Sequence, residues 1–161
     1  MKCIVAVDKN WGIGKNNGLL FKLKKDMAFF RQMTTDKVVV MGANTFDSFP
    51  NGALPNRVNI VLDHLNRQHS GAITVDTLEK LHLELEKYET ENVFVIGGAS
   101  VYKLLLDECD EAYITKVDAD GQAEVFFPNL DKKENWVLES EGQPQEDNGS
   151  LIKFCKYICK K

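Results

Sequence analysis

Three short apolar segments constrain the fold of this chain more than any other feature. They occupy residues 3–7, 38–41 and 93–96 and read C-I-V-A-V, V-V-V-M and V-F-V-I. A strand that is apolar at successive positions is typical of a parallel sheet with both faces covered. Neighbouring parallel strands need a crossover connection, which is usually a helix. The sequence therefore predicts an α/β fold with helices on both faces of a sheet.

The segments between these strands fit that plan. Two more short apolar segments are expected to be strands, at 58–62 and 72–75. Helical patterns follow the strands, at 19–34, 44–49, 78–88 and 99–106. Asn44 is expected to be the N-cap of the second helix, and Asp76 with Glu79 the capping box of the third.

The last third of the chain changes character, because its strands follow one another without a convincing helix between them. The expected strands are 112–117, 125–127, 136–139 and 151–159. Consecutive strands without crossovers pair antiparallel. We therefore expect one domain over residues 1–161, with a mixed sheet that is mostly parallel and has an antiparallel C-terminal edge strand.

Composition narrows the class of partner. The chain has 161 residues, of which 43% are hydrophobic and 27% charged, and its net charge of −4 favours neither nucleic acid nor an anionic membrane. The apolar segment near its first residue is too short to be the hydrophobic region of a signal peptide. The four cysteines include no close C-x-x-C pair, so we expect reduced thiols, no metal site and a cytoplasmic protein.

A carboxylate stands out in the helical segment at 19–34. At about 100° per residue, Asp26 falls on the same face as Phe29, Phe30 and Met33. One interpretation is that Asp26 only stabilises the positive end of a helix. The other is a desolvated carboxyl with a raised pKa that faces a pocket and pairs with a polar ligand.

Three glycine-containing segments complete the candidate chemistry. Gly97-Gly98 joins the third apolar strand to a helix, and residues 41–45 (M-G-A-N-T) join the second strand to another. Two such turns at the carboxyl edge of a sheet suggest a ligand with two phosphates, although glycines also occur there for steric reasons alone. The glycine-rich loop at 11–18 is either a mobile lid or only a long connection.

A series of motifs runs in order along nearly the whole chain: V-A-V-D-K-N-W-G-I-G, K-K-D-M-A-F-F-R-Q-M-T, V-V-M-G-A-N-T-F-D-S-F, L-P-N-R-V-N-I-V-L, V-F-V-I-G-G-A-S-V-Y, Y-I-T-K and F-F-P. In this order and spacing the chain resembles the dihydrofolate reductase family. The resemblance implies an eight-stranded mixed sheet and reduction of dihydrofolate to tetrahydrofolate with NADPH. It also implies a cytoplasmic monomer that binds antifolate-like molecules. The alternatives are a non-catalytic folate- or nucleotide-binding relative and a pyrimidine reductase of riboflavin synthesis.

The resemblance assigns roles to residues. Those nearest the chemistry are Asp26, which pairs with the pterin, and Phe21 and Leu19. The implied substrate contacts are Ile4, Val5, Ala6, Asp26, Met27, Phe30, Arg31, Phe49, Leu54, Arg57, Ile96, Tyr102 and Thr115. The implied cofactor contacts are Ala6, Ile13, Gly14, Asn17, Gly18, Leu19, Gly42, Ala43, Asn44, Thr45, Leu62, Asp63, His64, Ile96, Gly97, Gly98, Ala99, Ser100, Val101 and Tyr102.

Some positions depart from the family's usual pattern. Phe21 replaces a tryptophan, while Ala43 and Ser100 replace arginines near the cofactor. Asp63 stands where a hydroxyl residue often faces the 2′-phosphate of NADPH, so we expect NADH to be accepted as well. Arg67, close by together with His64, argues against that expectation, and Asp63 would matter to neither cofactor if it faced solvent.

Overall fold

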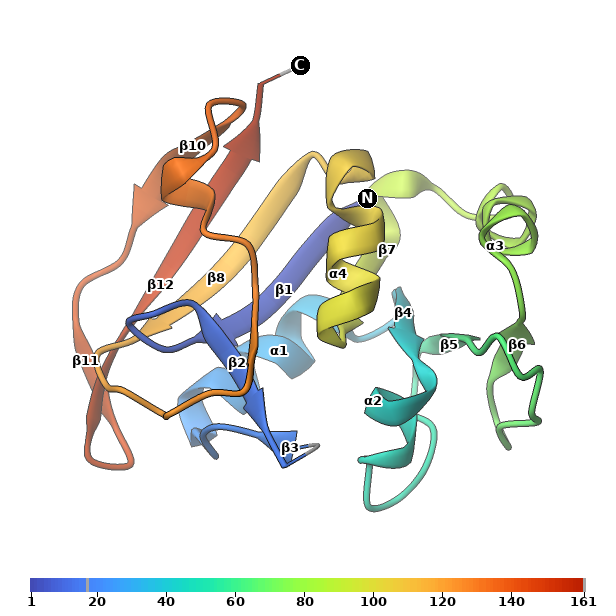
Figure 1. Cartoon of the computed structure of the whole chain (residues 1–161), viewed down its shortest axis with the longest axis horizontal. Helices are drawn as coiled ribbons and strands as arrows, with labels where there is room; N and C mark the ends of the chain where they lie inside the picture. The colour runs from blue at the N-terminus through green and yellow to red at the C-terminus, as the bar shows by residue number, and fades with distance from the viewer. Residues whose placement is uncertain (17, 161) are drawn as a thin grey trace.

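The computed structural model describes residues 1–16 and 18–160 and contains one main sheet (Figure 1). Eight strands form its path, in the order β10-β12-β8-β1-β7-β4-β5-β6. Their bounds are β1 (Lys2–Val7), β4 (Val38–Gly42), β5 (Val58–Leu62), β6 (Ile73–Val75), β7 (Val93–Gly97), β8 (Glu111–Val117), β10 (Trp136–Glu141) and β12 (Ser150–Cys159). A further strand, β11 (Gln145–Asp147), pairs with β12 beside this path.

The direction of the strands confirms the predicted mixed sheet. From β8 across to β6 every neighbouring pair is parallel. β12 runs antiparallel to both β8 and β10, so the antiparallel strand lies one place inside the edge that β10 forms. The crossovers between the parallel strands place helices on both faces, as expected for this class of sheet.

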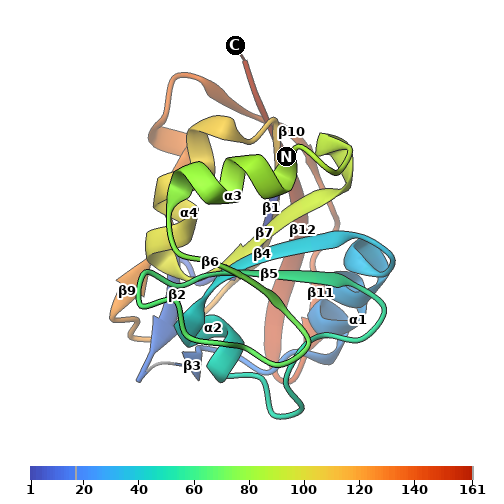
Figure 2. The same cartoon turned by 90° about the vertical axis from the view of Figure 1, so that its right-hand side faces the viewer.

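Helices cover both faces of the main sheet, and the sheet separates the core into two layers. Their bounds are α1 (Lys24–Thr34), α2 (Ala43–Asp47), α3 (Leu78–Leu85) and α4 (Ala99–Leu105), with 3-10 turns η1 (Thr90–Asn92), η2 (Leu106–Glu108) and η3 (Leu130–Lys132). Residues of α3 and α4 pack on one face of the sheet, and residues of α1 and α2 pack on the other (Figure 2).

The apolar strands show why both layers are needed. Val38 and Val40 of β4 face the α3 and α4 layer, whereas Val39 and Met41 face the α1 and α2 layer. All four side chains are buried. Each buried valine stabilises the fold by about 1.5–3 kcal/mol relative to an exposed one. The continuous apolar pattern of this strand is therefore the direct result of a sheet that has no solvent-facing side at this point.

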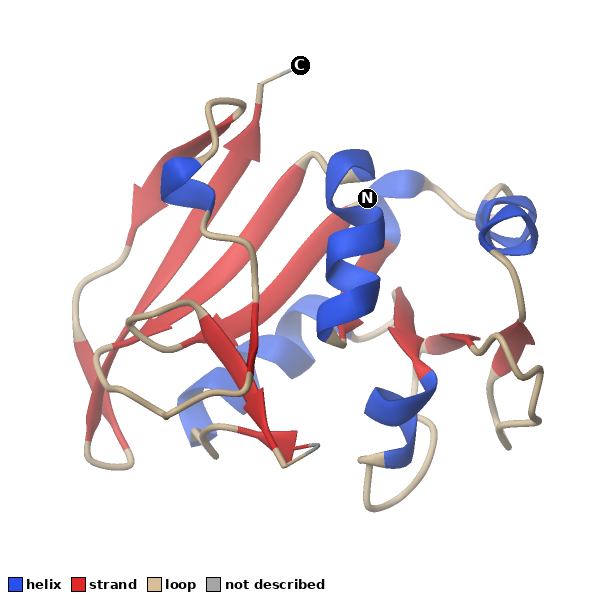
Figure 3. Cartoon of the chain, in the orientation of Figure 1, coloured by secondary structure: helices blue, strands red, loops and turns tan. Residues whose placement is uncertain are grey.

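The glycine-rich loop forms a second, small sheet beside the main one (Figure 3). It consists of β2 (Gly12–Lys15), β3 (Gly18–Leu19) and β9 (Val125–Phe126), in the order β3-β2-β9. The prediction of an irregular loop was therefore wrong in part, and the strand expected at 125–127 lies outside the main sheet. Because its hydrophobic positions are few, this hairpin is stabilised by pairing with a segment more than a hundred residues away.

Buried Asp8 holds this small sheet in place. Its Oδ1 accepts from the backbone N–H of Asn10 at 2.8 Å and of Gly12 at 2.7 Å, and its Oδ2 accepts from the N–H of Gly121 at 3.0 Å. Position 12 must be a glycine, because a Cβ there would lie 2.3 Å from the Cβ of Ala123. The loop and the segment that precedes β9 are thus fixed to each other.

Three helix starts differ from prediction. α2 begins at Ala43 with Gly42 as N-cap, so Asn44 is already inside the helix. Thr77, rather than a capping box, caps α3 by accepting from the N–H of Lys80 at 3.1 Å. α1 begins only at Lys24 and has no local side-chain cap.

Within the described ranges, none of the helices combines the length and the apolar character needed to span a membrane.

Candidate active site

Asp26 lies in the first turn of α1 and points to the sheet. The hydroxyl of Thr115, on β8, donates to its Oδ1 at 2.6 Å. Thr115 is almost fully buried and pairs with Ala6 of β1 in the parallel ladder. The helix therefore delivers one carboxylate to the carboxyl-terminal half of two neighbouring central strands.

The surroundings of Asp26 raise the pKa of its carboxyl. Burial is the largest cause, the bond from Thr115 opposes it, and the negative charge of Asp147 adds to the rise. Asp147 is near because its carboxylate caps α1, accepting from the backbone N–H of Lys24 at 3.2 Å and of Lys25 at 2.8 Å. Since Asp147 already supplies the anion at the positive end of this helix, the structure favours the interpretation of Asp26 as a desolvated carboxyl in a site.

Strands β1 and β7 separate beside this carboxylate. Their parallel register covers Lys2 with Phe94 and Cys3 with Val95, whereas β1 continues to pair with β8 as far as Val7. Beyond the split, the carbonyl of Ile4 accepts from the hydroxyl of Tyr102 at 2.8 Å. Beyond Cys3 and Val95 the edges of β1 and β7 that face each other are not paired in the ladder, and a flat ligand could reach main-chain acceptors there.

Two strand-to-helix turns lie together at the carboxyl edge of the same strands. A Cβ built on Gly97 or Gly98 would lie 3.2 or 3.3 Å from the hydroxyl oxygen of Thr45, and one on Gly42 would lie 3.2 Å from the side chain of Val101. Gly97 also has φ 139°, a conformation that favours glycine. The sequence prediction that the two turns lie next to each other agrees with this geometry.

Two arginines converge at the C-terminal end of α1. Arg57 donates from Nε to the carbonyl of Pro55 at 2.9 Å and from Nη1 to the hydroxyl of Thr34 at 3.3 Å. Burial, followed by the positive charge of Arg31, lowers the pKa of Arg57. An anion placed between these two guanidinium groups would relieve their repulsion, so the pair is suited to a carboxylate.

The apolar residues assigned to the substrate or the cofactor include two groups that differ in exposure. Phe30, Phe49 and Leu54 are partly buried and pack against the core layer beneath α1 and α2. Met27 is 53% exposed and Leu19 is 80% exposed. Both side chains therefore lie largely outside the core, and Met27 directly follows Asp26 in α1.

Phe21, two residues after Leu19, is partly buried. Its ring belongs to a small apolar cluster with Leu23, Val117 and Ile152. A Cβ on Gly121 would lie 3.2 Å from the tip of this ring. Phe21 therefore closes the base of the loop, on the same segment that carries Leu19. Asn17, which the sequence assigned to the cofactor, lies outside the described residues.

The prediction for Asp63 has to be corrected. Its carboxylate is buried and accepts from Arg67 Nε and His69 Nε2, both at 2.9 Å, and from the backbone N–H of Leu65 at 3.0 Å. A side chain with all these partners faces neither a ribose nor solvent. Its neighbour His64 is exposed.

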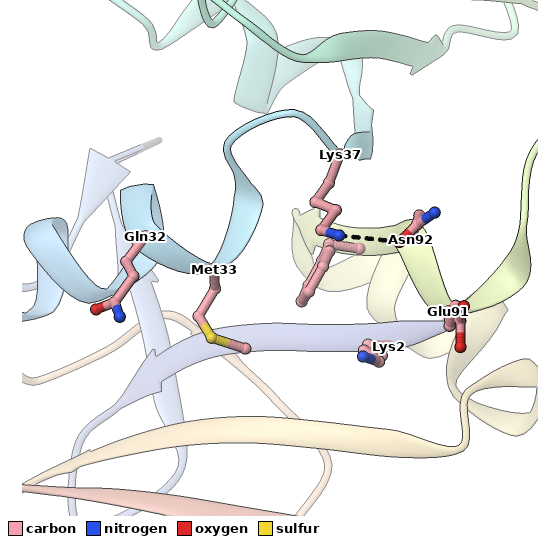
Figure 4. A pocket seen from close by; sticks show the side chains of 7 residues that line it. Lys2, Gln32, Met33, Lys37, Glu91 and Asn92 are labelled. Carbon is pink, nitrogen blue, oxygen red and sulfur yellow. Dashed lines mark hydrogen bonds between the residues drawn. The ribbon is translucent and has the colours of Figure 1, made fainter.

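A separate open groove of about 420 Å³ lies at the opposite, amino-terminal end of β1 and β7 (Figure 4). A hydrogen bond of 3.0 Å from Lys37 Nζ to the side chain of Asn92 spans it. Its lining consists of Lys2, Gln32, Met33, Lys37, Glu91, Asn92 and Phe94. Met33 lies on the same face of α1 as Asp26 but two turns further along the helix, and neither Asp26 nor Thr115 lines the groove.

Comparison with known proteins identifies the family. The dihydrofolate reductase family model matches residues 1–161. The chain is 35% identical to dihydrofolate reductase of Haemophilus influenzae over 155 residues, which cover 96% of this chain and 94% of that protein. It is 36% identical to dihydrofolate reductase of Bacillus subtilis over 157 residues, covering 96% and 91%. The chain belongs to the dihydrofolate reductase family.

A solved member of the family supports the same fold. It is the dihydrofolate reductase of Enterococcus faecalis complexed with NADP(H) and RAB-propyl, with a TM-score of 0.87 and 30% identity. The similarity covers 99% of this chain and 96% of that one. The predicted fold class and family are therefore confirmed, and the match removes the pyrimidine reductase alternative.

The sequence analysis missed two residues that hold other parts of the structure in place, Asp147 and His69. Asp147, which caps α1, comes directly before Asn148-Gly149, both with positive φ, at the turn between β11 and β12. Asn-Gly is a strong hairpin signal, so this turn was readable from the sequence. His69 had no such signal, because its pairing with Asp63 depends on how the connection after β5 folds back.

In the part of the chain that the structure describes, no three His, Cys, Asp or Glu side chains are grouped so that they could hold a metal ion.

Proposed function

We propose that this chain reduces 7,8-dihydrofolate to 5,6,7,8-tetrahydrofolate by hydride transfer from NADPH, with Asp26 as the residue that binds and polarises the pterin. Family membership over the full chain supports the reaction, and the NADP(H) complex of the Enterococcus faecalis relative supports the cofactor. The observation that carries the role of Asp26 is its desolvated carboxylate, fixed by Thr115 where β1 and β7 separate.

The residues present fit a dinucleotide. A Cβ on Gly97 or Gly98 would crowd the hydroxyl of Thr45, so glycine lets the two turns pack closely at the edge of the sheet where dinucleotides bind. When bound, NADPH supplies the hydride. The contribution of this chain is to hold donor and acceptor face to face, because orientation of two reactants removes a large part of the barrier.

Asp26 serves the second half of the reaction, the protonation of the pterin. Its carboxylate can accept from a ring N–H and the 2-amino group of dihydrofolate, while Thr115 holds it in one orientation. A negative charge held in an apolar site raises the basicity of the substrate nitrogen next to the carbon that receives hydride. A raised pKa also allows this carboxyl to carry a proton closer to neutral pH than an exposed aspartate does.

The remaining substrate contacts follow the same cleft. Arg57, with Arg31 beside it, is suited to the α-carboxylate of the glutamate tail. Phe30, Phe49 and Leu54 provide the apolar walls between this cation and Asp26. The substrate would thus be held by charge at both ends and by apolar contact between them.

The direct test follows loss of reduced nicotinamide when purified protein is mixed with dihydrofolate and NADPH. We expect oxidation that depends on dihydrofolate, and tetrahydrofolate as the product by chromatography. Omitting dihydrofolate gives the background rate. Tight binding of both ligands without turnover would contradict the proposal and would instead support a non-catalytic binding protein.

We further propose that the protein acts as a monomer in the cytoplasm and binds antifolate-like molecules in the same cleft. Every polar side chain that the proposed mechanism uses comes from one copy of the chain. Light scattering after gel filtration tests the monomer, and competition between dihydrofolate and a diaminopyrimidine tests the shared cleft. A dimer mass, or binding without competition, would contradict the respective part.

A further inference from the structure

An Asn-Gly step forms the tip of the hairpin between β11 and β12, on the side of the molecule where α1 begins (Figure 1). Asp147 pairs with Ser150, so Asn148 and Gly149 make up the turn, and their φ angles are positive, at 51° and 83°. Both turn residues are exposed, whereas Asp147 beside them is buried. The turn is therefore open to water on one side and joined to the interior on the other.

Side chains of this hairpin hold the start of α1. Asp147 accepts from the backbone N–H of Lys24 and Lys25, at 3.2 and 2.8 Å. The side-chain amide of Asn148 donates from Nδ2 to the carbonyl of Lys22 at 3.2 Å. Because α1 has no side-chain cap of its own, its first turn depends on these contacts. That turn carries the carboxylate proposed to bind the pterin.

The exposed step has the groups needed for a reaction with itself. The main-chain N–H of Gly149 has no hydrogen-bond partner within the described residues, and a Cβ there would meet nothing within 4 Å. This nitrogen can attack the side-chain amide carbon of Asn148, form a cyclic imide and give up its proton to the departing ammonia. Water then opens the imide at either carbonyl and leaves aspartate or isoaspartate. Water is thus the sole co-reactant, and β11 is short enough for the turn to open locally.

The sequence contains two further Asn-Gly steps, which provide a comparison. Asn17, in the step with Gly18, lies outside the described residues. Asn51 is exposed like Asn148, but the N–H of Gly52 donates to the carbonyl of Phe49 at 3.5 Å. The attacking nitrogen is therefore more available at Asn148 than at Asn51.

We propose that Asn148 is a site of spontaneous deamidation, and that its conversion loosens the start of α1 and weakens dihydrofolate binding. The new carboxylate cannot donate to the carbonyl of Lys22, and it places a second negative charge beside Asp147. Isoaspartate also adds a carbon to the main chain, inside a turn whose length is fixed by the pairing of Asp147 with Ser150. The effect on binding rests on the proposed function, whereas the conversion and the loosening of α1 do not.

The first test incubates the purified protein at mildly alkaline pH and separates the products by anion exchange. Peptide mapping should find the mass gain of an amide replaced by a carboxyl at Asn148, partly as isoaspartate. Hydrogen exchange should show faster exchange at Lys24 and Lys25 in the modified fraction than in the intact one. An Asn148 that stays intact over several half-lives of the same step in a peptide of residues 145–152 would overturn the site. Unchanged exchange in the modified fraction would overturn the link to α1.

The second test measures dihydrofolate binding by fluorescence titration. Loss of a helix cap corresponds to a factor of roughly 2–30 in an equilibrium, so the modified fraction should bind dihydrofolate several-fold more weakly than the intact one. Asn148→Gly should prevent this loss on ageing, because Gly-Gly also suits the turn and has no side-chain amide. Asn51→Gly, the matched control at the other exposed step, should not prevent it.

Two outcomes separate this inference from the proposed function. Equal dihydrofolate affinity in the modified and intact fractions, or the same loss on ageing in Asn148→Gly, would overturn the link between the turn and the site. If the intact wild type bound no dihydrofolate, the proposed function would fail. The mass and hydrogen-exchange measurements would still decide whether Asn148 converts and loosens α1.

Discussion

Replacing Asp26 with Asn tests the mechanism with little change in volume. The substitution removes the negative charge but keeps an acceptor for Thr115, whose bond to Asp26 measures 2.6 Å. Loss of one partner of a buried, hydrogen-bonded charge pair costs about 2–5 kcal/mol in binding. A positioned acid or base contributes about 10²–10⁴ to rate. We therefore expect kcat/KM at neutral pH to fall by at least a hundredfold.

The stability of Asp26→Asn relative to the wild type should depend on pH. A hydrogen bond to a charged group contributes about 1.5–3 kcal/mol and one to a neutral group about 0.5–1.5, so the weaker bond costs the variant roughly 1 kcal/mol. Removal of a buried charge offsets this at neutral pH. The pKa of Asp26 is raised in the folded state, so its stabilising contribution is present at low pH and is lost as pH rises through the folded pKa. The wild type should therefore gain stability relative to Asp26→Asn as the pH is lowered.

The assays are steady-state reduction of dihydrofolate and urea unfolding, each at neutral and mildly acidic pH. Acid should restore part of the rate of the variant, because the substrate is then protonated in solution. Asp36→Asn is the matched control, since Asp36 is an exposed aspartate just after the same helix and tolerates Asn at its φ of 64°. Unchanged activity of Asp26→Asn at neutral pH would remove Asp26 from the mechanism.

Three more substitutions or reagents test other parts of the structure. Arg57→Leu should weaken dihydrofolate binding by about 2–5 kcal/mol and spare NADPH, as measured by titration; equal weakening of both would indicate a structural role. Phe21→Trp adds an indole N–H donor and should raise the single-turnover hydride-transfer rate at a stability cost of about 1–3 kcal/mol. A slower rate in a folded variant would refute the idea that the lack of this N–H limits the rate. A thiol reagent should modify Cys159 first and leave Cys3 and Cys109 unmodified until unfolding, because both are fully buried and the hydrogen bond with Cys109, followed by burial, raises the pKa of Cys3. Early loss of Cys3 in a mass spectrum would contradict this order.

The fold was largely readable from the sequence, because its strongest signals are local. Continuous apolar strands such as 38–41 have one simple explanation, and the absence of helices after Leu106 required antiparallel pairing. What failed were features decided by distant contacts. The loop at 11–18 contains β2 only because β9 pairs with it, and α1 starts at Lys24 because Asp147 caps it from the other end of the chain.

The site shows the same division. The placement of Asp26 on an apolar helix face followed from periodicity, and family resemblance assigned Thr115, its hydrogen-bond partner, to the same site. The orientation of Asp63 was predicted wrongly, because residue identity gives the charge of a side chain but not the direction in which it points. Whether that charge faces a ligand or the interior depends on Arg67 and His69, which reach it through a turn that propensities do not specify.

The placement of β1 has a consequence for how the protein is made. Lys2 pairs with Phe94 on one side and with Glu111 on the other, so the first strand leaves the ribosome long before either neighbour exists. Thr115 and then Asp147, which position Asp26 and its helix, emerge later still. An apolar N-terminal strand must therefore wait, unpaired, through most of translation, the interval in which nascent chains depend on chaperones. Folate binding by ribosome-bound chains would then appear only when synthesis is nearly complete.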